Sequence, residues 1–128
     1  MVIDEQFLTQ LIEHASVNTR KRQVYLLHKS FNAPSQRMLN AMVPGTEVPI
    51  HRHSDKEETY AILKGSIIVH FYNNDREAVE SNVLSAIGNN RMLVIPQGQW
   101  HSVEVLEPSV IFEVCDGPYT PLPKEDIM

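Results

Sequence analysis

The sequence predicts one all-β domain, a β-sandwich or barrel, preceded by a single short α-helix. Its 128 residues fall in the size range of one ordinary domain. A hydrophobic content of 42% with 21% charged residues indicates an ordered core rather than a disordered chain. After the N-terminal region, about nine short apolar stretches recur at intervals of roughly 8–12 residues, with turn residues between them. Such short, regularly spaced strands favour a sandwich or barrel over an alternating α/β fold.

The first element is predicted to be a helix that begins after Asp4, whose side chain can cap the first turn. Apolar residues then recur at the roughly 3–4-residue spacing of one helical face. These residues are Phe7, Leu8, Leu11, Ile12 and Ala15. We therefore divide the chain into an N-terminal helix and basic turn (1–22), a β-barrel (23–116) and a Pro-rich C-terminal tail (117–128), which together make one structural domain.

The strands of the barrel are separated by residues that are typical of turns. Lys64-Gly65 is a tight turn in which glycine supplies a positive φ, and Asn73-Asn74-Asp75 is a hairpin signal. The predicted strands cover residues 24–28, 37–43, 48–53, 58–63, 66–72, 83–87, 91–95, 101–106 and 110–115. The tail holds too many prolines for a helix or a central strand, so we expect it to lie extended on the surface.

The most specific signal is the pair His51 and His53, followed by an acidic residue and a distant third histidine. On a strand, side chains at i and i+2 leave the same face, so His51 and His53 point at one spot. Glu58 and His101 can close on that spot from neighbouring strands. Imidazole and carboxylate ligands suit a divalent transition metal, which the sequence leaves open among Fe, Mn, Ni, Co, Cu and Zn.

The choice between Glu57 and Glu58 follows from strand alternation. Neighbouring residues on a strand point to opposite faces, so only one of the two can join the histidines. Glu58 shares its face with Tyr60 and Ile62, which belong to an apolar interior. Glu57 is then expected to face solvent or a subunit contact.

These residues resemble the two motifs of the cupin superfamily. The first motif, Gly-x5-His-x-His-x4-Glu-x6-Gly, is matched in full by Gly45, His51, His53, Glu58 and Gly65. The second is matched by Pro96, Gly98 and His101, and it departs at Asn90 and Val105, where the family has Gly and Asn. Asn tolerates a positive φ, so Asn90 is expected to serve the same turn. The resemblance implies a double-stranded β-helix, the jelly-roll cupin barrel, with His51, His53, Glu58 and His101 as metal ligands.

More narrowly, the helical start, the run from Arg37 to Met42, the His51-Arg-His53 triplet and the stretch from Phe112 to Tyr119 resemble the small bacterial WbuC-type cupin metalloproteins. That resemblance implies a role in surface-polysaccharide (O-antigen) biosynthesis, on a sugar, a nucleotide-sugar or a small oxygenated metabolite. The metal would support Lewis-acid isomerisation or oxygen chemistry. The alternatives are a non-catalytic cupin that binds or senses a sugar, and a structural subunit of a polysaccharide assembly.

Four further residues are candidates for the pocket around the metal. Tyr60 shares the face of the ligands, and its other interpretation is a packed core aromatic. Glu113 is a charge inside an apolar strand and could act as a base or support a ligand histidine. Arg37 and Asn40 could contact a ligand if they face the cavity, and Arg37 would suit a carboxylate or phosphate.

Composition argues against several classes of protein. A formal net charge of −5 and a pI near 5.6 disfavour nucleic-acid binding, and the run Arg20-Lys21-Arg22 is short enough to be a solvated turn. The one cysteine, Cys115, cannot form an internal disulfide and is expected to be a buried thiol. The sequence has no membrane-spanning stretch and an acidic start unlike a signal peptide, so we expect a cytoplasmic protein. A homodimer is expected, because so small a barrel has an edge strand to cover.

Overall fold

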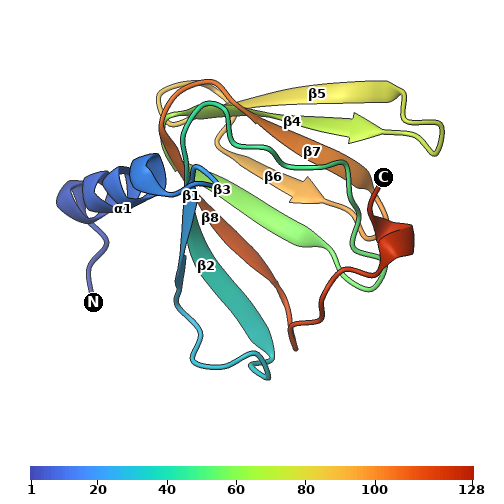
Figure 1. The fold of residues 1–128 in the computed structure, drawn as a ribbon, viewed down its shortest axis with the longest axis horizontal. Helices are drawn as coiled ribbons and strands as arrows, with labels where there is room; N and C mark the ends of the chain where they lie inside the picture. The colour runs from blue at the N-terminus through green and yellow to red at the C-terminus, as the bar shows by residue number, and fades with distance from the viewer.

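The computed structural model describes residues 1–128 and contains one α-helix, eight β-strands and one turn of 3-10 helix (Figure 1). The elements are α1 (Glu5–Val17), β1 (Arg22–Leu26), β2 (Ser35–Met42), β3 (Glu58–Lys64), β4 (Ser66–Tyr72), β5 (Ala78–Ser85), β6 (Met92–Ile95), β7 (Trp100–Val105), β8 (Ser109–Asp116) and η1 (Lys124–Asp126). The strands form two antiparallel sheets, ordered β1-β2-β8-β3-β6 and β5-β4-β7. The predicted all-β fold with one N-terminal helix is confirmed.

Helix α1 covers the outer face of the five-stranded sheet. Its N-terminus is capped as predicted, because the Asp4 carboxylate accepts a hydrogen bond from the Phe7 N–H at 2.9 Å. Its apolar face packs against the outward side chains of β2 and β8 in one buried cluster. The cluster consists of Leu8, Leu11, Ala15, Leu39, Ala41 and Val110. Strands β2 and β8 are therefore buried on both faces, which holds the sheet rigid where the site will be built.

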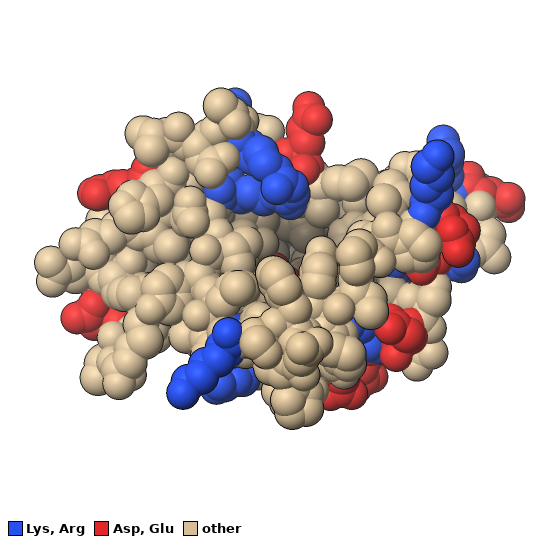
Figure 2. Space-filling view, turned by 60° about the horizontal axis from the view of Figure 1, so that its bottom comes forward, with Lys and Arg blue, Asp and Glu red and all other residues tan.

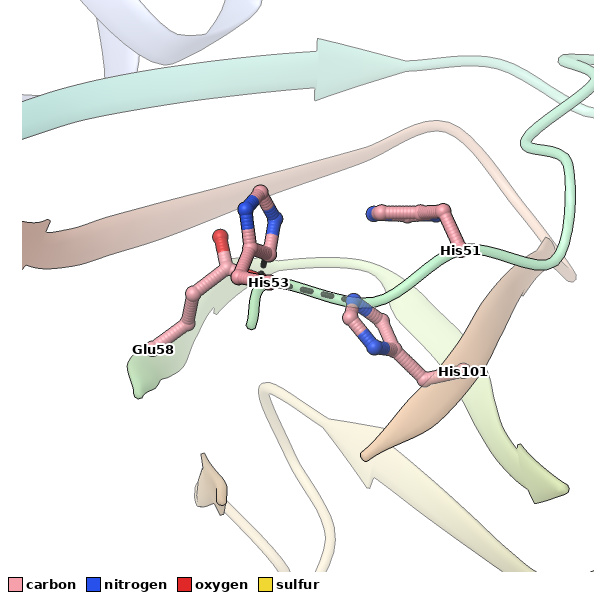
Figure 3. A group of neighbouring side chains, drawn as sticks. All are labelled: His51, His53, Glu58 and His101. Carbon is pink, nitrogen blue, oxygen red and sulfur yellow. Dashed lines mark ion pairs between the residues drawn. The ribbon is translucent and has the colours of Figure 1, made fainter. Parts of the chain in front are cut away.

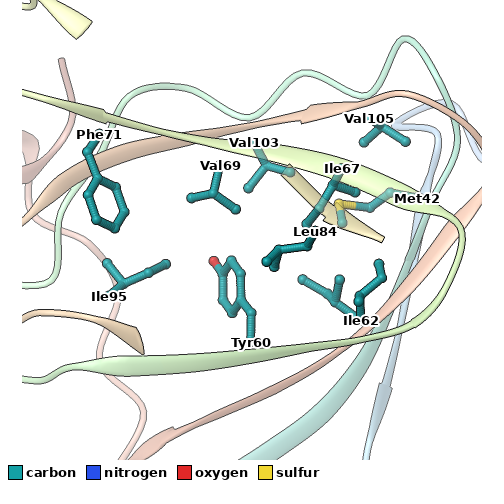
Figure 4. Packing of buried hydrophobic residues seen from close by; sticks show 11 residues of the cluster. Met42, Tyr60, Ile62, Ile67, Val69, Phe71, Leu84, Ile95, Val103 and Val105 are labelled. Atoms are coloured by element: carbon teal, nitrogen blue, oxygen red, sulfur yellow. The ribbon is translucent and has the colours of Figure 1, made fainter. Parts of the chain in front are cut away.

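The main core lies between the two sheets (Figure 4). Strand β4 shows how the sequence builds it, since Ile67, Val69 and Phe71 are buried while the residues between them are partly exposed. The core residues are Met42, Tyr60, Ile62, Ile67, Val69, Phe71, Leu84, Ile95, Val103, Val105 and Ile111. Fully burying one such side chain stabilises the fold by about 1.5–3 kcal/mol. This core runs between the sheets as far as Phe71 and Ile95, the direct strand partners of His101 and Glu58.

Two predicted strands differ from the structure. The segment 48–53 is not a strand, because only His51 pairs, through isolated bridges to His101 and to Ile127. Pro49 has no N–H to donate, which prevents a continuous ladder there. Strand β5 begins at Ala78 rather than at residue 83. Its first residues are exposed, so the sequence shows no apolar alternation by which its start could be recognised.

The turn after β3 is built as predicted, but the turn at Asn90 is not. Gly65 has a φ of +81°, and a side chain there would run into the Pro108 carbonyl oxygen and Ser109. Asn90 does not have a positive φ; the non-glycine residues that do are Lys21 and Arg76. The expectation that Asn90 replaces a left-handed glycine is therefore wrong.

The Pro-rich tail returns to the barrel and pairs with the segment around His51. The Met128 N–H donates to the Ile50 carbonyl oxygen at 2.8 Å, and the Arg52 N–H donates to the Asp126 carbonyl oxygen at 3.0 Å. On its other side, His51 exchanges two backbone hydrogen bonds with His101, at 3.0 and 2.9 Å. The backbone of His51 is thus fixed between β7 and the tail. No helix in the structure is both long and apolar enough to span a membrane.

Candidate metal centre

Four side chains from three parts of the chain converge on one point (Figure 3). His51 and His53 come from the segment before β3, Glu58 is the first residue of β3, and His101 lies on β7 of the other sheet. Each offers one ligand atom, and these atoms all lie within 4.8 Å of one another. The structure therefore brings together the whole predicted set. Glu57 is exposed and stays outside it.

Backbone carbonyls fix the orientation of two of the imidazoles. The Nδ1–H of His51 donates to the Pro49 carbonyl oxygen at 2.8 Å, and the Nδ1–H of His101 donates to the Gln99 carbonyl oxygen at 2.9 Å. Since a carbonyl can only accept, each Nδ1 carries the proton, which leaves each Nε2 with a free lone pair. Carbonyls that hold the second nitrogen in this way are typical partners of metal-binding histidines.

Glu58 lies at the centre of the cluster and is only 6% exposed. Its Oε1 lies 3.1 Å from Nε2 of His53 and 3.4 Å from Nε2 of His101. Burial alone would raise the pKa of Glu58, but the two imidazoles beside the carboxylate outweigh it and lower the pKa to about 2. The carboxylate is therefore ionised at neutral pH.

The imidazoles differ in how readily they release a proton. Burial, together with the charge of His101, lowers the pKa of His51 to about 4. Burial also acts to lower the pKa of His53, but the neighbouring Glu58 carboxylate outweighs it and raises that pKa. His51 is thus neutral and ready to act as a ligand, whereas His53 holds a proton more tightly than a free imidazole does.

Two polar atoms inside the cluster are buried without a hydrogen-bond partner, Oε1 of Glu58 and Nε2 of His101. A buried polar group normally has a partner, and the lack of one is unfavourable by about 1–3 kcal/mol. Here both atoms point at the other ligand atoms of the cluster (Figure 3). A divalent cation is the partner that would satisfy both, and the mixed imidazole and carboxylate set suits a transition metal. The residues present fit such an ion.

The cluster opens into a cavity of about 220 Å³ between the two sheets. Tyr60 and Asn40 line it, as expected, and so does Glu113. Tyr60 and Glu113 are direct partners across β3 and β8. Asn40 donates from its side-chain amide to Oε1 of Glu113 at 3.0 Å, while its own Oδ1 is buried without a partner. The inner wall therefore carries a polar pair beside the ligands.

The pKa values of the ionisable groups of this wall are raised. Burial, with the charge of Glu58, raises the pKa of Glu113 to about 7. The same two causes raise the pKa of Tyr60 well above its ordinary value and that of Cys115 to about 11. Cys115 is thus a thiol without nucleophilic character, as the sequence suggested, although it is only partly buried.

Arg37 is placed differently from the expectation. It is exposed and lies on the face of β2 opposite to Met38 and Asn40, so it does not line the cavity. The cations that do line it are Arg22 of β1 and Lys56 of the loop before β3. Sequence reasoning missed both. Arg22 stood in a run interpreted as a solvated turn, and its position beside the ligands depends on the pairing of β1 with β2.

Sequence reasoning also missed a second buried carboxylate, Asp126. Its Oδ1 accepts from Nε of Arg52 at 2.8 Å, and the Ser54 hydroxyl bonds both of its oxygens at 2.8 and 2.7 Å. The guanidinium of Arg52 also lies over the Trp100 ring, 4.4 Å from the ring centre. These contacts hold Arg52 on the side of the segment away from its two histidine neighbours. Nothing local in the sequence marks Asp126, because its partners are more than 70 residues away.

The fold is the jelly roll seen in cupin structures, and it carries a candidate metal centre. Structurally similar proteins share this fold. The capsular polysaccharide assembling protein CapF from Staphylococcus aureus superposes with a TM-score of 0.69 at 20% identity, over 82% of this chain and 30% of CapF. KdgF from Halomonas sp. superposes with a TM-score of 0.60 at 19% identity, over 81% of this chain and 85% of KdgF. A cupin-2 domain containing protein from Shewanella frigidimarina superposes with a TM-score of 0.55 at 20% identity, over 72% of this chain and 78% of that protein.

The family of the chain is also shown by sequence. The chain belongs to the family described as domain of unknown function DUF6016, whose model matches residues 3–84. The matched part contains α1 and three of the four clustered side chains and ends before His101. No curated protein matches the sequence. The chain spans less than a third of the length of CapF, so CapF supports the fold and not a shared activity.

Proposed function

We propose that this protein is a metal-dependent cupin enzyme that acts on a sugar, nucleotide-sugar or similar small oxygenated metabolite. One observation carries the proposal. The ligand atoms of His51, His53, Glu58 and His101 converge on one point, and two of these atoms are buried without a partner. The first three of these residues also line a cavity. A closed structural site would have no need of an adjoining cavity, whereas a catalytic one requires room for a substrate.

The chain's own residues would hold the ion and orient the substrate. His51 and His101 are fixed by backbone carbonyls, and Glu58 contributes the negative charge. An ion with open positions supplies Lewis-acid chemistry, which polarises a substrate oxygen. The apolar wall of Met38, Met42 and Ile111 would exclude water from the rest of the cavity.

Glu113 is the residue best suited to move a proton. It lies on the cavity wall, its Oε1 is oriented by Asn40, and its pKa of about 7 allows the carboxyl to give or take a proton near neutral pH. Tyr60 lies directly across from it, and its phenol stays protonated and can donate a hydrogen bond. Isomerisation through a proton moved between adjacent carbons needs a group of this kind.

The assignment to a sugar-like substrate draws on two supports. A cavity of about 220 Å³ is suited to one small polar ring rather than to an extended polymer. The resemblance to WbuC-type cupins and the fold shared with CapF, named as a capsular polysaccharide assembling protein, both point toward polysaccharide biosynthesis.

The test is metal analysis joined to turnover. Protein purified without chelators is expected to contain close to one equivalent of a transition metal by mass spectrometry, and the double variant His51→Ala/His53→Ala is expected to lose it. His14→Ala, an exposed histidine of α1, is the matched control and should keep the metal. Loss of turnover of a sugar or nucleotide-sugar on chelation supports an enzyme. Metal-independent ligand binding without turnover would instead identify a sensor and contradict the proposal.

A further inference from the structure

A second hollow adjoins the metal cavity. It is a groove of about 1200 Å³ at the end of the barrel where α1 leads into β1. Arg22, Val48 and Val103 line both the groove and the metal cavity, so the two spaces share a wall. Pro49, whose carbonyl oxygen holds His51, also lines the groove. One small molecule could therefore place one end at the metal centre and the other in this groove.

The groove carries three consecutive cations, Arg20, Lys21 and Arg22. On the face shown in Figure 2, Lys and Arg side chains gather beside a hollow in the surface. None of these three side chains donates a hydrogen bond or forms an ion pair within the protein. Other cations have such partners, since Lys64 pairs with Glu5 and Arg52 with Asp126. The three charges are thus free to take an external anion.

Two carboxylates, Glu47 and Glu104, also line the groove and leave the three cations a formal surplus of +1. Glu104 is engaged elsewhere, because its Oε2 lies 2.9 Å from Nε2 of His70. Glu47 is not paired with any of the three cations. The local surplus of positive charge stands out in a chain whose formal net charge is −5.

The basic turn is held in one conformation by the fold. Lys21 has a φ of +59°, a left-handed conformation that is unfavourable for a lysine. Its carbonyl oxygen accepts from the Val43 N–H at 3.1 Å and from the Thr46 hydroxyl at 2.7 Å. Its side chain crosses the space above Gly45, where an added Cβ would lie 3.3 Å from Cδ of Lys21. A preformed turn of unpaired cations is suited to ligand binding rather than to a loosely solvated loop.

We propose that this groove binds the phosphoryl group of the substrate, so that the substrate is a phosphorylated or diphosphate-activated sugar. The inference rests on the proposed function, since it assigns the metal cavity to the sugar end. Two guanidinium groups and an ammonium match the charge and the several acceptor oxygens of a phosphoryl group.

The test uses pyrophosphate and metal-free protein, because pyrophosphate chelates metals directly. Calorimetric titration is expected to show pyrophosphate binding, with a dissociation constant at least tenfold higher in Arg20→Gln/Lys21→Gln/Arg22→Gln. The control Lys29→Gln/Arg76→Gln/Arg91→Gln makes the same charge change outside the groove and should shift the constant less than twofold. Equal weakening by both triple variants would show only a net-charge effect and overturn the proposal, as would equal affinity for succinate.

A further variant separates this inference from the proposed function. His51→Ala/His53→Ala is expected to lose metal and to retain pyrophosphate binding. Metal binding by a wild-type protein that takes up no pyrophosphate would overturn the phosphoryl site and leave the metal enzyme intact. Pyrophosphate binding by a wild-type protein that takes up no transition metal would overturn the metal enzyme and leave the phosphoryl site intact. The single variant Arg22→Lys, which keeps the charge and removes the guanidinium fork, should weaken pyrophosphate binding by a measurable fraction of the triple-variant effect.

Discussion

Glu58 and Asp126 are both buried carboxylates beside the segment from His51 to His53, and their surroundings differ. Asp126 is 4% exposed, and both of its oxygens accept hydrogen bonds from Arg52 or Ser54. Glu58 is 6% exposed, and its Oε1 lies close to two imidazoles without a hydrogen bond of proper geometry. The polar atoms of Asp126 find partners within the protein, whereas Oε1 of Glu58 has no hydrogen-bond partner. The two carboxylates are equally buried, and what distinguishes the structural one from the candidate ligand is whether its oxygens have hydrogen-bond partners.

The largest effect is expected from removing the charge of Glu58. In Glu58→Gln, affinity for a divalent transition metal should fall by more than about 100-fold, since a ligand is worth more than the outer partners whose loss costs about 10–100-fold. Isothermal titration with Ni²⁺ or Zn²⁺ measures it. The control is Glu57→Gln, the same change at the exposed neighbour, which should bind as wild type does. Similar weakening in both variants would contradict the distinction between the two residues.

A smaller effect on the metal and a clear effect on stability are expected from Asp126→Ala. The variant leaves the Arg52 guanidinium and the Ser54 hydroxyl without their shared acceptor, so the melting temperature should drop by about 5 °C. Metal affinity should fall by about tenfold, because the histidines on either side of Arg52 lose their support. Scanning calorimetry and metal titration give the two values. Glu125→Ala, an exposed neighbour, should change neither. Loss of affinity as great as in Glu58→Gln would show that the two carboxylates are not functionally distinct.

The contact of Glu58 with His53 should also make the stability of the metal-free protein depend on pH. The pKa of Glu58 is lowered to about 2, so its contribution to stability is present above its ordinary 4.5 and is lost as pH falls toward 2. The pKa of His53 is raised above 6.5, so its contribution is present below 6.5 and is lost as pH rises through the raised value. Metal-free protein should therefore gain most from this pair between about pH 4.5 and 6.5.

Urea denaturation of metal-free protein across this pH range measures the effect. In Glu58→Gln the maximum should flatten, because the histidine loses its charged partner. The acid loss that comes from Asp126 should persist in this variant, since hydrogen bonds from Arg52 and Ser54 lower the pKa of Asp126 independently of Glu58. An unchanged pH profile in Glu58→Gln would be evidence against the ion pair.

The smallest effect concerns Glu113, a carboxyl that is neither fully satisfied nor a ligand. Its pKa is raised to about 7, so burial destabilises the metal-free protein progressively as pH rises from 4.5 through 7. Glu113→Gln removes that penalty and should stabilise metal-free protein at pH 8 by about 1–3 kcal/mol. At pH 4 the two proteins should have the same stability within about 0.5 kcal/mol. No gain at pH 8 would show that the carboxylate is already well solvated.

The parts of the fold and site that sequence could predict were those encoded by short-range pattern. Strand alternation in β3 places Glu58, and not Glu57, with the histidines, and Asp4 and Gly65 are local signals with local reasons. The apolar residues of the segment 48–53 predicted a strand. The segment does not form one, because Pro49 has no N–H to donate to a continuous ladder. Arrangement of the four clustered side chains is as expected, and that they bind a metal stays a prediction.

The parts that sequence could not predict depend on contacts between distant segments. Asp126 has no local signature, and its role exists only because the tail returns to Arg52. The cavity takes its cations from Arg22 and Lys56 rather than Arg37, since strand phase on β2 turns Arg37 outward. A shift of one residue along a strand moves a charged side chain to the opposite face of the sheet. Where apolar residues occur on both faces of a strand, their pattern does not show which face the charge occupies.

The position of Trp100 gives the protein an optical reporter of its own site. It is the one tryptophan of the chain, it is 7% exposed, and it precedes His101. Its indole N–H donates to the Asn74 side chain at 2.9 Å, and the Arg52 guanidinium covers its face. Tryptophan fluorescence, excited where the four tyrosines do not absorb, will therefore come from a single known place. Quenching by a paramagnetic ion such as Cu²⁺, and a red shift when the tail detaches, would be read from one emission band without any added label.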